Sequence, residues 1–277
     1  MKLPEPEVIC SIVRKAAKAE LLPRFADVTR DRKRDGSIVT VADRAMQDNL
    51  EFELKQRWPE FRLLGEEMSE ARQAELLAAP GAGIWIVDPL DGTSNFAAGI
   101  PFYSVSVALM VGGRSVLGVV YDPARDECFS ATETGSAHLN GQPLKDLAAA
   151  PDSLKQCIAT VDFKRLPASL LLRLVDAPPY SSQRSFGSVA LDWCWAAAGR
   201  FHLYLHGRQK IWDYAAGHLI MERMGGHSCG LDGGPVFLAS GEPRSALAAL
   251  DQDIFHQWRE WILLKQYSSD RSAGSLI

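Results

Sequence analysis

Residues 85–96 read Trp-Ile-Val-Asp-Pro-Leu-Asp-Gly-Thr-Ser-Asn-Phe, an apolar run that ends in two carboxylates three residues apart, followed by a glycine and a hydroxyl. Ile84 to Val87 are apolar without alternation, as in a strand buried on both faces. Pro89 fixes its own φ and Asp91-Gly92 is a strong turn pair, so we expect the chain to reverse as soon as the strand ends. Asp88 and Asp91 are then expected to project from one tight bend.

The chemistry of this segment suits a metal ion and a phosphate. Carboxylates and backbone carbonyls are preferred ligands of hard divalent cations, and the Leu90 carbonyl lies between the two aspartates. Gly92 lets the backbone come close to a ligand, and if Thr93 opens a helix, the free N–H groups there face an anion. The alternative is a plain polar turn, because Asp-Pro and Asp-Gly are common turn formers. An EF-hand loop is excluded because its acidic spacing is missing.

Further acidic signals lie elsewhere in the chain. Glu66 and Glu67 follow an expected short strand, Phe61 to Leu64, whereas Asp43 and Asp213 each stand where a helix is expected to begin. Each signal has a structural explanation of its own, since the aspartates could be N-caps and the glutamates a solvated turn. Those explanations become much weaker when all the signals are considered together.

With these motifs in place, the chain resembles the inositol monophosphatase superfamily of magnesium-dependent, lithium-sensitive phosphatases. The resemblance covers nearly the whole chain and rests on five motifs in the family's order: VTVAD at 39–43, GEE at 65–67, DPLDGTSNF at 88–96, GS at 187–188 and WDYAAG at 212–217. DPxDGT followed by WDxxAG is far more specific than a lone glycine motif.

The resemblance implies a role for each matching residue. It implies that Glu66, Asp88 and the Leu90 carbonyl hold one Mg²⁺, that Asp88, Asp91 and Asp213 hold a second, and that Glu67 belongs to a weaker third. Glu66 and the pair Thr93–Asp43 are implied to be catalytic, the pair orienting the attacking water, with no covalent phosphoenzyme. The substrate contacts implied are Asp91, Gly92, Thr93, Gly187, Ser188, Val189, His206 and Asp213.

Carboxylates gathered this closely need cations to compensate their charge. Carboxylates within a few ångströms repel one another and raise one another's pKa, so the cluster is stable only around metal ions. Two ions neutralise a phosphate and stabilise both the incoming and the departing oxygen of an in-line displacement. The function expected is therefore Mg²⁺-dependent hydrolysis of a small phosphomonoester.

Substrate identity is less constrained. Inositol monophosphatases carry a glutamate where this chain has His206, which puts myo-inositol in doubt, although His206 could also be an ordinary surface imidazole at a strand end. The TSNF sequence at 93–96 resembles the inositol branch more than the nucleotidase branch. We favour a small polyol or sugar monophosphate over a 3′(2′),5′-bisphosphate nucleotide. A non-catalytic regulatory member is the third alternative, and the filled ligand positions argue against it.

Residues 226–230, Gly-His-Ser-Cys-Gly, match the Gly-x-Ser-x-Gly nucleophile elbow of α/β-hydrolases. An elbow needs a strand before the serine and a helix after it, whereas here a helix is expected before and a turn after. We therefore do not expect a serine nucleophile.

Composition agrees with a soluble enzyme of 277 residues that is 47% hydrophobic and 23% charged, with a formal net charge of −4. The charge argues against a nucleic-acid partner, and the lack of a long apolar run or a signal peptide argues against a membrane and for the cytoplasm. Five widely spaced cysteines predict apolar core residues rather than disulfides or zinc. The resemblance implies a homodimer.

Periodicity predicts an α+β half at 1–145, which carries most metal ligands, and an α/β half at 146–277, which carries Asp213 and the substrate contacts. The resemblance implies the layered α-β-α-β-α sandwich of the family, with the site between the halves. The basic stretch 30–34 is expected to be a mobile loop near the site, and the tail after Tyr267 to be disordered. Helices are expected at 5–20, 40–58, 168–175, 189–198, 213–224 and 251–265, and strands at 61–64, 84–87, 103–111, 115–122, 127–132, 138–139, 156–161, 201–205 and 246–249.

Overall fold

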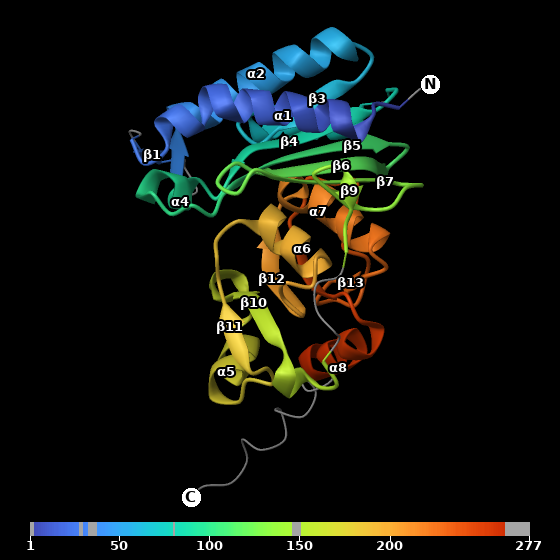
Figure 1. Cartoon of the computed structure of the whole chain (residues 1–277). Helices are drawn as coiled ribbons and strands as arrows, with labels where there is room; N and C mark the ends of the chain where they lie inside the picture. Colours follow the sequence, from blue (N-terminus) through green and yellow to red (C-terminus); the bar gives the residue numbers. More distant parts are fainter. Residues whose placement is uncertain (1–2, 28–29, 33–37, 80, 146–150, 264–277) are drawn as a thin grey trace, which may run out of the picture.

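The computed structural model describes residues 3–27, 30–32, 38–79, 81–145 and 151–263. Its elements stack in layers (Figure 1), which confirms the predicted α-β-α-β-α sandwich. The first layer holds α1 (Pro6–Glu20) and α2 (Val41–Arg57), the central layer α6 (Val189–Ala197) and α7 (Ile211–Arg223), and the last α5 (Ala168–Asp176) and α8 (Gln252–Leu263). A β-sheet lies on each side of the central helices.

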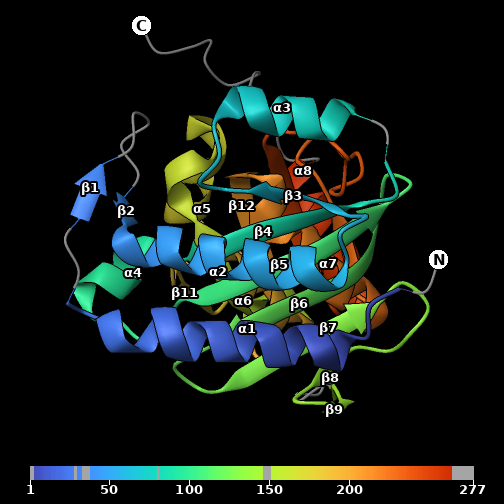
Figure 2. The ribbon, with the colours of Figure 1, turned by 90° about the horizontal axis from the view of Figure 1, so that it is seen from above.

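The first sheet has seven strands in the order β3-β4-β5-β6-β7-β8-β9. Only β3 and β4 run parallel, and every other neighbouring pair is antiparallel. Figure 2 shows α1 and α2 side by side across this sheet. The strands are β3 (Arg62–Gly65), β4 (Ile84–Asp91), β5 (Ser104–Val111), β6 (Arg114–Asp122), β7 (Glu127–Thr132), β8 (His138–Leu139) and β9 (Gln142–Pro143).

The second sheet has five strands in the order β11-β10-β12-β14-β13. The first three run parallel, and β14 is antiparallel to both of its neighbours. The strands are β10 (Ile158–Asp162), β11 (Ser182–Arg184), β12 (Leu203–Gln209), β13 (His227–Cys229) and β14 (Arg244–Ala249). Short elements connect the rest: α3 (Glu70–Ala78), α4 (Thr93–Ala98), the 3₁₀ turns η1 (Leu22–Arg24), η2 (Leu154–Gln156) and η3 (Phe163–Arg165), and the hairpin of β1 (Arg30–Arg32) with β2 (Ile38–Thr40).

The largest apolar core lies between the two sheets and is built around α6 and α7. Close approach makes this layer possible: a Cβ added at Gly118 of β6 would lie 2.8 Å from the Ala216 carbonyl oxygen of α7. Separate apolar clusters join α1 and α2 to the first sheet, and α5 and α8 to the second. The two halves of the chain are therefore packed through a shared helical layer.

Strand β4 delivers the aspartates to that layer. All eight of its residues are buried, as the unbroken apolar run predicts. Ile84 and Ile86 face the central core, whereas Trp85 and Val87 face α1 and α2. By this alternation Asp88 belongs to the central face, and a residue three positions later would belong to the opposite one.

A β-bulge changes that outcome for Asp91. Asp88 pairs with Ser106 and Asp91 with Ser104, so three steps along β4 match two along β5. The extra residue returns Asp91 to the same face of the sheet as Asp88, so both aspartates lie toward α6 and α7. The expectation that the chain reverses directly after Val87 is therefore wrong, since the strand continues to Asp91 and tolerates Pro89 at the bulge.

Several elements differ from the sequence-based expectation. Arg30–Arg32 forms a strand rather than a loop, because it pairs with β2, while residues 33–34 lie outside the described part of the chain. Helix α3 was not predicted because only Gln73 and Leu76 of its polar sequence are buried. The short strands β11 and β13 were not predicted either. The tail after Tyr267 lies outside the described residues.

Residues 226–230 do not form a nucleophile elbow. Helix α7 precedes them, Ser228 lies within β13, and a turn follows. This helix–strand–turn order is not the strand–serine–helix order of an elbow, as expected. Among the described helices, none combines the length and the apolar character needed to cross a membrane.

Candidate active site

The site is built at the end of β4. Asp88 is 2% exposed and Asp91 is 8% exposed. Asp88 Oδ1 accepts a hydrogen bond from the Leu90 backbone N–H at 3.0 Å, which turns the Leu90 carbonyl toward Thr93 Oγ1, 2.9 Å away. Within the DPLD segment, Asp88 is thus held by the Leu90 backbone N–H, and the Leu90 carbonyl by the Thr93 hydroxyl.

Asp91 is fixed by the N-terminus of α6. Its Oδ2 accepts hydrogen bonds from Ser188 Oγ at 2.6 Å and from the Ala190 N–H at 2.8 Å, with Ser104 Oγ at 3.4 Å. A helix N-terminus presents unpaired N–H groups and partial positive charge, so it holds a carboxylate well. This contact joins the DPLD bend of the first sheet to the helix that covers it.

Asp43 and Asp213 are held in the same manner by their own helices. Each lies two residues inside the first turn, and its Oδ2 accepts the backbone N–H of the residue before the helix, Thr40 or Lys210, at 2.7 Å in both cases. The N-cap explanation is therefore wrong in detail, because both occupy the third helical position of a capping arrangement. One oxygen of each of three aspartates is thus anchored at a helix N-terminus.

The acids influence one another strongly. Burial raises the pKa of Asp88 well above its usual value, and the charges of Glu66, Asp91 and Asp213 raise it further. Burial likewise raises the pKa of Asp213, with added repulsion from Asp91 and Glu66. The structure therefore brings Glu66, Asp88, Asp91 and Asp213 together, and we call these four residues the acidic cluster.

For Asp91 and Asp43, hydrogen bonds at the helix N-termini oppose the increase in pKa that burial causes, but they do not cancel it. Burial raises the pKa of Asp91, although the hydrogen bonds from Ser188 and from the backbone of α6 oppose it. Burial also raises the pKa of Asp43 to about 6, against the opposing hydrogen bonds of Thr40, and the charge of Glu67 adds to the increase. Glu67 therefore lies near Asp43, at the edge of the acidic cluster.

The donor set fits a hard divalent cation, because it consists of oxygens whose negative charges only a cation would compensate. Within the described ranges, no three His, Cys, Asp or Glu side chains surround one point closely enough to hold a metal ion without moving, so the carboxylates would have to adjust on binding.

A glycine cradle lies beside the acids. Gly92 has φ +91° and immediately precedes α4, and a Cβ there would lie 3.1 Å from the Phe102 carbonyl oxygen and 3.2 Å from that of Gly187. Gly187 also has a positive φ, +86°. Thr93 begins α4, as the sequence suggested, and its hydroxyl lies 3.0 Å from Asp43 Oδ1, which confirms that the two side chains meet.

Ser188 and His206 have environments that the sequence did not predict. Ser188 is 0% exposed and its hydroxyl is engaged by Asp91. His206 is 3% exposed and lies inside β12, so the surface-imidazole interpretation is wrong. Its Nε2 lies 3.1 Å from Asp162 Oδ2, and its Nδ1 accepts the Arg208 N–H at 3.2 Å.

Sequence reasoning missed two further residues beside the site. Asn95 Nδ2 donates to the Phe102 carbonyl at 2.7 Å and to the Phe186 carbonyl at 2.6 Å, and so ties α4 to the segment that carries Gly187. Asp192 of α6 is buried, and burial and the charge of Asp91 raise its pKa well above normal. One signal was available, since Asp192 is the only charged residue in the apolar sequence 189–197.

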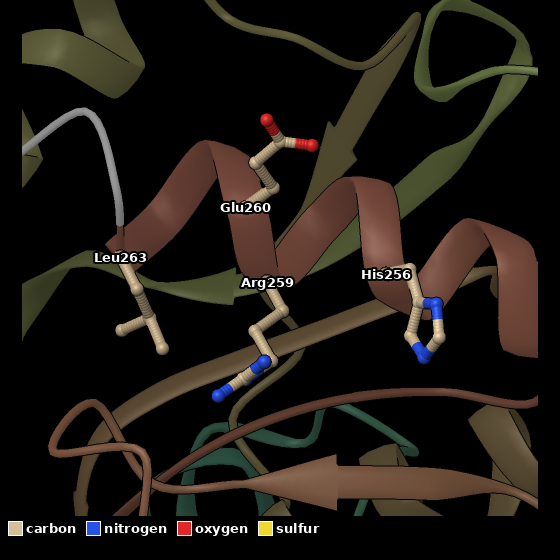
Figure 3. Close-up of a pocket in the computed structure, with 4 residues that line it drawn as sticks. All are labelled: His256, Arg259, Glu260 and Leu263. Atoms are coloured by element: carbon tan, nitrogen blue, oxygen red, sulfur yellow. The ribbon is translucent and has the colours of Figure 1, made fainter.

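The acidic cluster does not coincide with the cavity of about 290 Å³ along α8 (Figure 3). There, His256, Arg259 and Leu263 point to one side of the helix and Glu260 to the other. None of these four described lining residues was predicted to belong to the site. The acidic side chains that could hold metal ions lie at the DPLD segment instead.

A profile of the Inositol monophosphatase family matches residues 7–262. The chain belongs to the inositol monophosphatase family. This match extends over nearly all of the described structure and includes every motif that carried the resemblance.

Curated relatives in this family carry two kinds of name. The chain is 32% identical over 241 residues to "Nus factor SuhB" of Pasteurella multocida, covering 84% of this chain and 87% of that protein. It is 38% identical over 196 residues to "Inositol monophosphatase 1" of Solanum lycopersicum, covering 68% of this chain and 70% of that protein.

Solved structures share the fold over almost the whole chain. An IMPase of Thermotoga maritima superposes with a TM-score of 0.79 at 27% identity, covering 94% of this chain and 96% of that one. A structure described as "IMPase/NADP phosphatase complexed with Mg2+ and phosphate" superposes with a TM-score of 0.78 at 26% identity, covering 93% and 94%.

Proposed function

We propose that this protein is a Mg²⁺-dependent phosphomonoesterase that hydrolyses a small polyol or sugar monophosphate. The observation that carries the proposal is the acidic cluster: carboxylates, two of them buried, that raise one another's pKa beside a glycine cradle at the start of a helix. Family membership supports it, as does the related fold described with Mg²⁺ and phosphate.

The residues that would hold the ions follow from the cluster. Glu66, Asp88 and the Leu90 carbonyl would bind one Mg²⁺, and Asp88, Asp91 and Asp213 a second, while Glu67 would serve a weaker third ion. When bound, the ions supply positive charge that neutralises the phosphate and the oxygens entering and leaving phosphorus. The helix contacts of Asp91 and Asp213 hold one oxygen of each carboxylate, which restricts how far these two ligands would move on binding.

In this proposal Thr93 and Asp43 position the attacking water, and Glu66, which faces Asp88, is the third catalytic residue. Thr93 Oγ1 lies 3.0 Å from Asp43 Oδ1, so its proton can pass to that carboxylate while its oxygen accepts a proton from the water. The pKa of Asp43 is raised to about 6, mainly by burial, which makes Asp43 a better acceptor than an ordinary aspartate. Proton transfer therefore needs no histidine.

The phosphate would lie against Gly92 and Thr93, where first-turn N–H groups have no acceptor within the helix. The alcohol would extend toward Gly187, Ser188 and Val189. Because the Ser188 hydroxyl is engaged by Asp91, contact there would come from the backbone. His206, bonded to Asp162, would have to exchange that partner for the substrate or act through it.

Two other functions retain specific support. A nucleotide substrate is favoured by the related structure described as an NADP phosphatase. A regulatory role, with or without turnover, is favoured by the relative named "Nus factor SuhB". The homodimer, the cytoplasmic location and the absence of a nucleic-acid partner stay predictions.

The test is phosphate release from inositol 1-phosphate, sugar monophosphates, 3′-phosphoadenosine 5′-phosphate and NADP, each with Mg²⁺ and with a chelator. We expect turnover of a polyol or sugar monophosphate that stops with the chelator. Preference for a nucleotide would replace the substrate class, and no turnover across the panel at saturating Mg²⁺ would favour the regulatory role.

A further inference from the structure

Helix α1 places one thiol directly over another. Helix α1 packs across β6 and β7 (Figure 2). Cys10 belongs to α1 and Cys128 to β7. Cys128 belongs to the apolar cluster between α1 and the sheet, and Cys10 packs against the same cluster. The two side chains lie close enough for each thiol to perturb the pKa of the other, although they are distant in sequence.

The surroundings make the two thiols unequal. Cys10 is only half-buried, whereas Cys128 is 1% exposed. The hydrogen bond from Cys128 lowers the pKa of Cys10 despite its burial, and Ser130 and Arg14 lower it further. The same contact and burial raise the pKa of Cys128 well above normal. Cys10 is therefore the better nucleophile, and Cys128 keeps its proton.

Arg14 is well placed to maintain this difference. It lies one turn after Cys10 on α1 and is held by hydrogen bonds to Asp126 Oδ1 at 2.6 Å and to Asn140 Oδ1 at 2.9 Å. These contacts fix its guanidinium over the β7–β8 side of the sheet, 5.3 Å from the Tyr121 ring centre. A fixed positive charge thus accompanies a thiol that solvent can reach.

We propose that Cys10 and Cys128 are a peroxide-sensitive thiol pair that closes to an intramolecular disulfide. The Cys10 thiolate attacks one oxygen of hydrogen peroxide, so that an S–O bond forms, the O–O bond breaks and hydroxide leaves as water. The Cys128 sulfur then attacks the Cys10 sulfur, so that the S–S bond forms, the S–O bond breaks and a second water leaves with the Cys128 proton. Two thiols lose two electrons, which reduce one peroxide to two waters.

The disulfide would fasten α1 covalently to the sheet. It would close a loop between residues 10 and 128, which restricts the unfolded chain and stabilises the folded one. Cys157, Cys194 and Cys229 are also buried, but they lie in the other two apolar clusters and serve as internal references.

The test treats the full-length protein with hydrogen peroxide, alkylates it with iodoacetamide and maps its peptides without reduction. We expect two of the five thiols to become unavailable and a Cys10–Cys128 peptide to appear, both reversed by dithiothreitol. Cys10→Ser should abolish the cross-link, and Cys128→Ser should leave a sulfenic acid at Cys10 that dimedone captures. Cys157→Ser should behave as the wild type.

Thermal denaturation gives a second readout. The oxidised wild type should melt at a higher temperature than the reduced protein, and Cys10→Ser should show no such difference. The proposal is overturned if all five thiols stay titratable after peroxide, if a different pair forms, or if Cys128 is oxidised as readily in Cys10→Ser as in the wild type.

Discussion

The pKa values of carboxylates at the two sheets shift in opposite directions. At the end of β4, the acidic cluster gathers carboxylates that raise one another's pKa. At the second sheet, Asp162, whose side chain is 27% exposed, lies beside the buried His206, and although burial alone would raise the pKa of Asp162, the hydrogen bond from His206 lowers it to about 2. The carboxylates of the acidic cluster repel one another, whereas Asp162 accepts a hydrogen bond from a neighbouring imidazole.

This difference separates a site from a structural pair. A carboxylate whose charged form accepts hydrogen bonds within the fold stabilises the native state, whereas carboxylates that face each other destabilise it unless a cation is bound. In our proposal the acidic cluster binds an external cation, whereas the Asp162–His206 pair needs none. The following predictions change one region at a time.

The largest effect is expected for Asp88→Asn. The charges of Glu66, Asp91 and Asp213 all act on Asp88, which is the proposed ligand of both ions. Its loss should therefore lower Mg²⁺-dependent kcat/KM about a thousandfold. The same change removes repulsion, so the melting temperature in chelator should rise or stay equal. Steady-state kinetics and thermal denaturation test this, with Asp232→Asn, an exposed acid paired with Arg244, as the control.

Magnesium should stabilise the wild type much more than a variant that lacks one carboxylate of the acidic cluster. At one hundred times the dissociation constant, a ligand of the native state adds about 2.7 kcal/mol to the free energy of unfolding. We expect a gain of that order for the wild type in urea denaturation, and a much smaller one for Asp213→Asn. Equal gains in both proteins would mean that Mg²⁺ binds elsewhere.

The smallest of these effects concerns the internal pair. The Asp162 pKa falls from 3.8 to about 2 on folding, so the pair adds about 2 kcal/mol above pH 3.8, and this is lost as the pH falls toward 2. Asp162→Asn should therefore lose about 2 kcal/mol at pH 7 in urea denaturation, and the difference from the wild type should shrink below pH 3.8.

His206→Gln provides the matched control, because it removes the partner and keeps the acid. It should lose a similar amount at neutral pH, and in neither variant should Mg²⁺ change the loss. If Mg²⁺ restored the stability of Asp162→Asn, the distinction between the two regions would not hold.

Much of the site could be predicted because its signals are local. The apolar run into DPLDG predicts a buried strand, and β4 is buried throughout. Helices beginning close to Asp43 and Asp213 followed from single turns of sequence. The specific order of the motifs then predicted the layered fold, which the structure confirms.

The remaining features depend on contacts between distant segments. The bulge that turns Asp91 to the same face as Asp88 is set by pairing with β5, and a turn signal in the sequence does not distinguish it from a reversal. The burial of His206 against Asp162 depends on the register of β10 and β12. Helix α3 lacks an apolar stripe, because only Gln73 and Leu76 are buried.

The most direct test of the central claim is a crystal structure with Mn²⁺ in place of Mg²⁺ and with phosphate, examined by anomalous scattering. We predict anomalous peaks coordinated by Asp88, with Glu66 on one side and Asp91 and Asp213 on the other, and phosphate beside Gly92 and Thr93. Crystals at saturating Mn²⁺ with no anomalous peak at the acidic cluster would contradict the account.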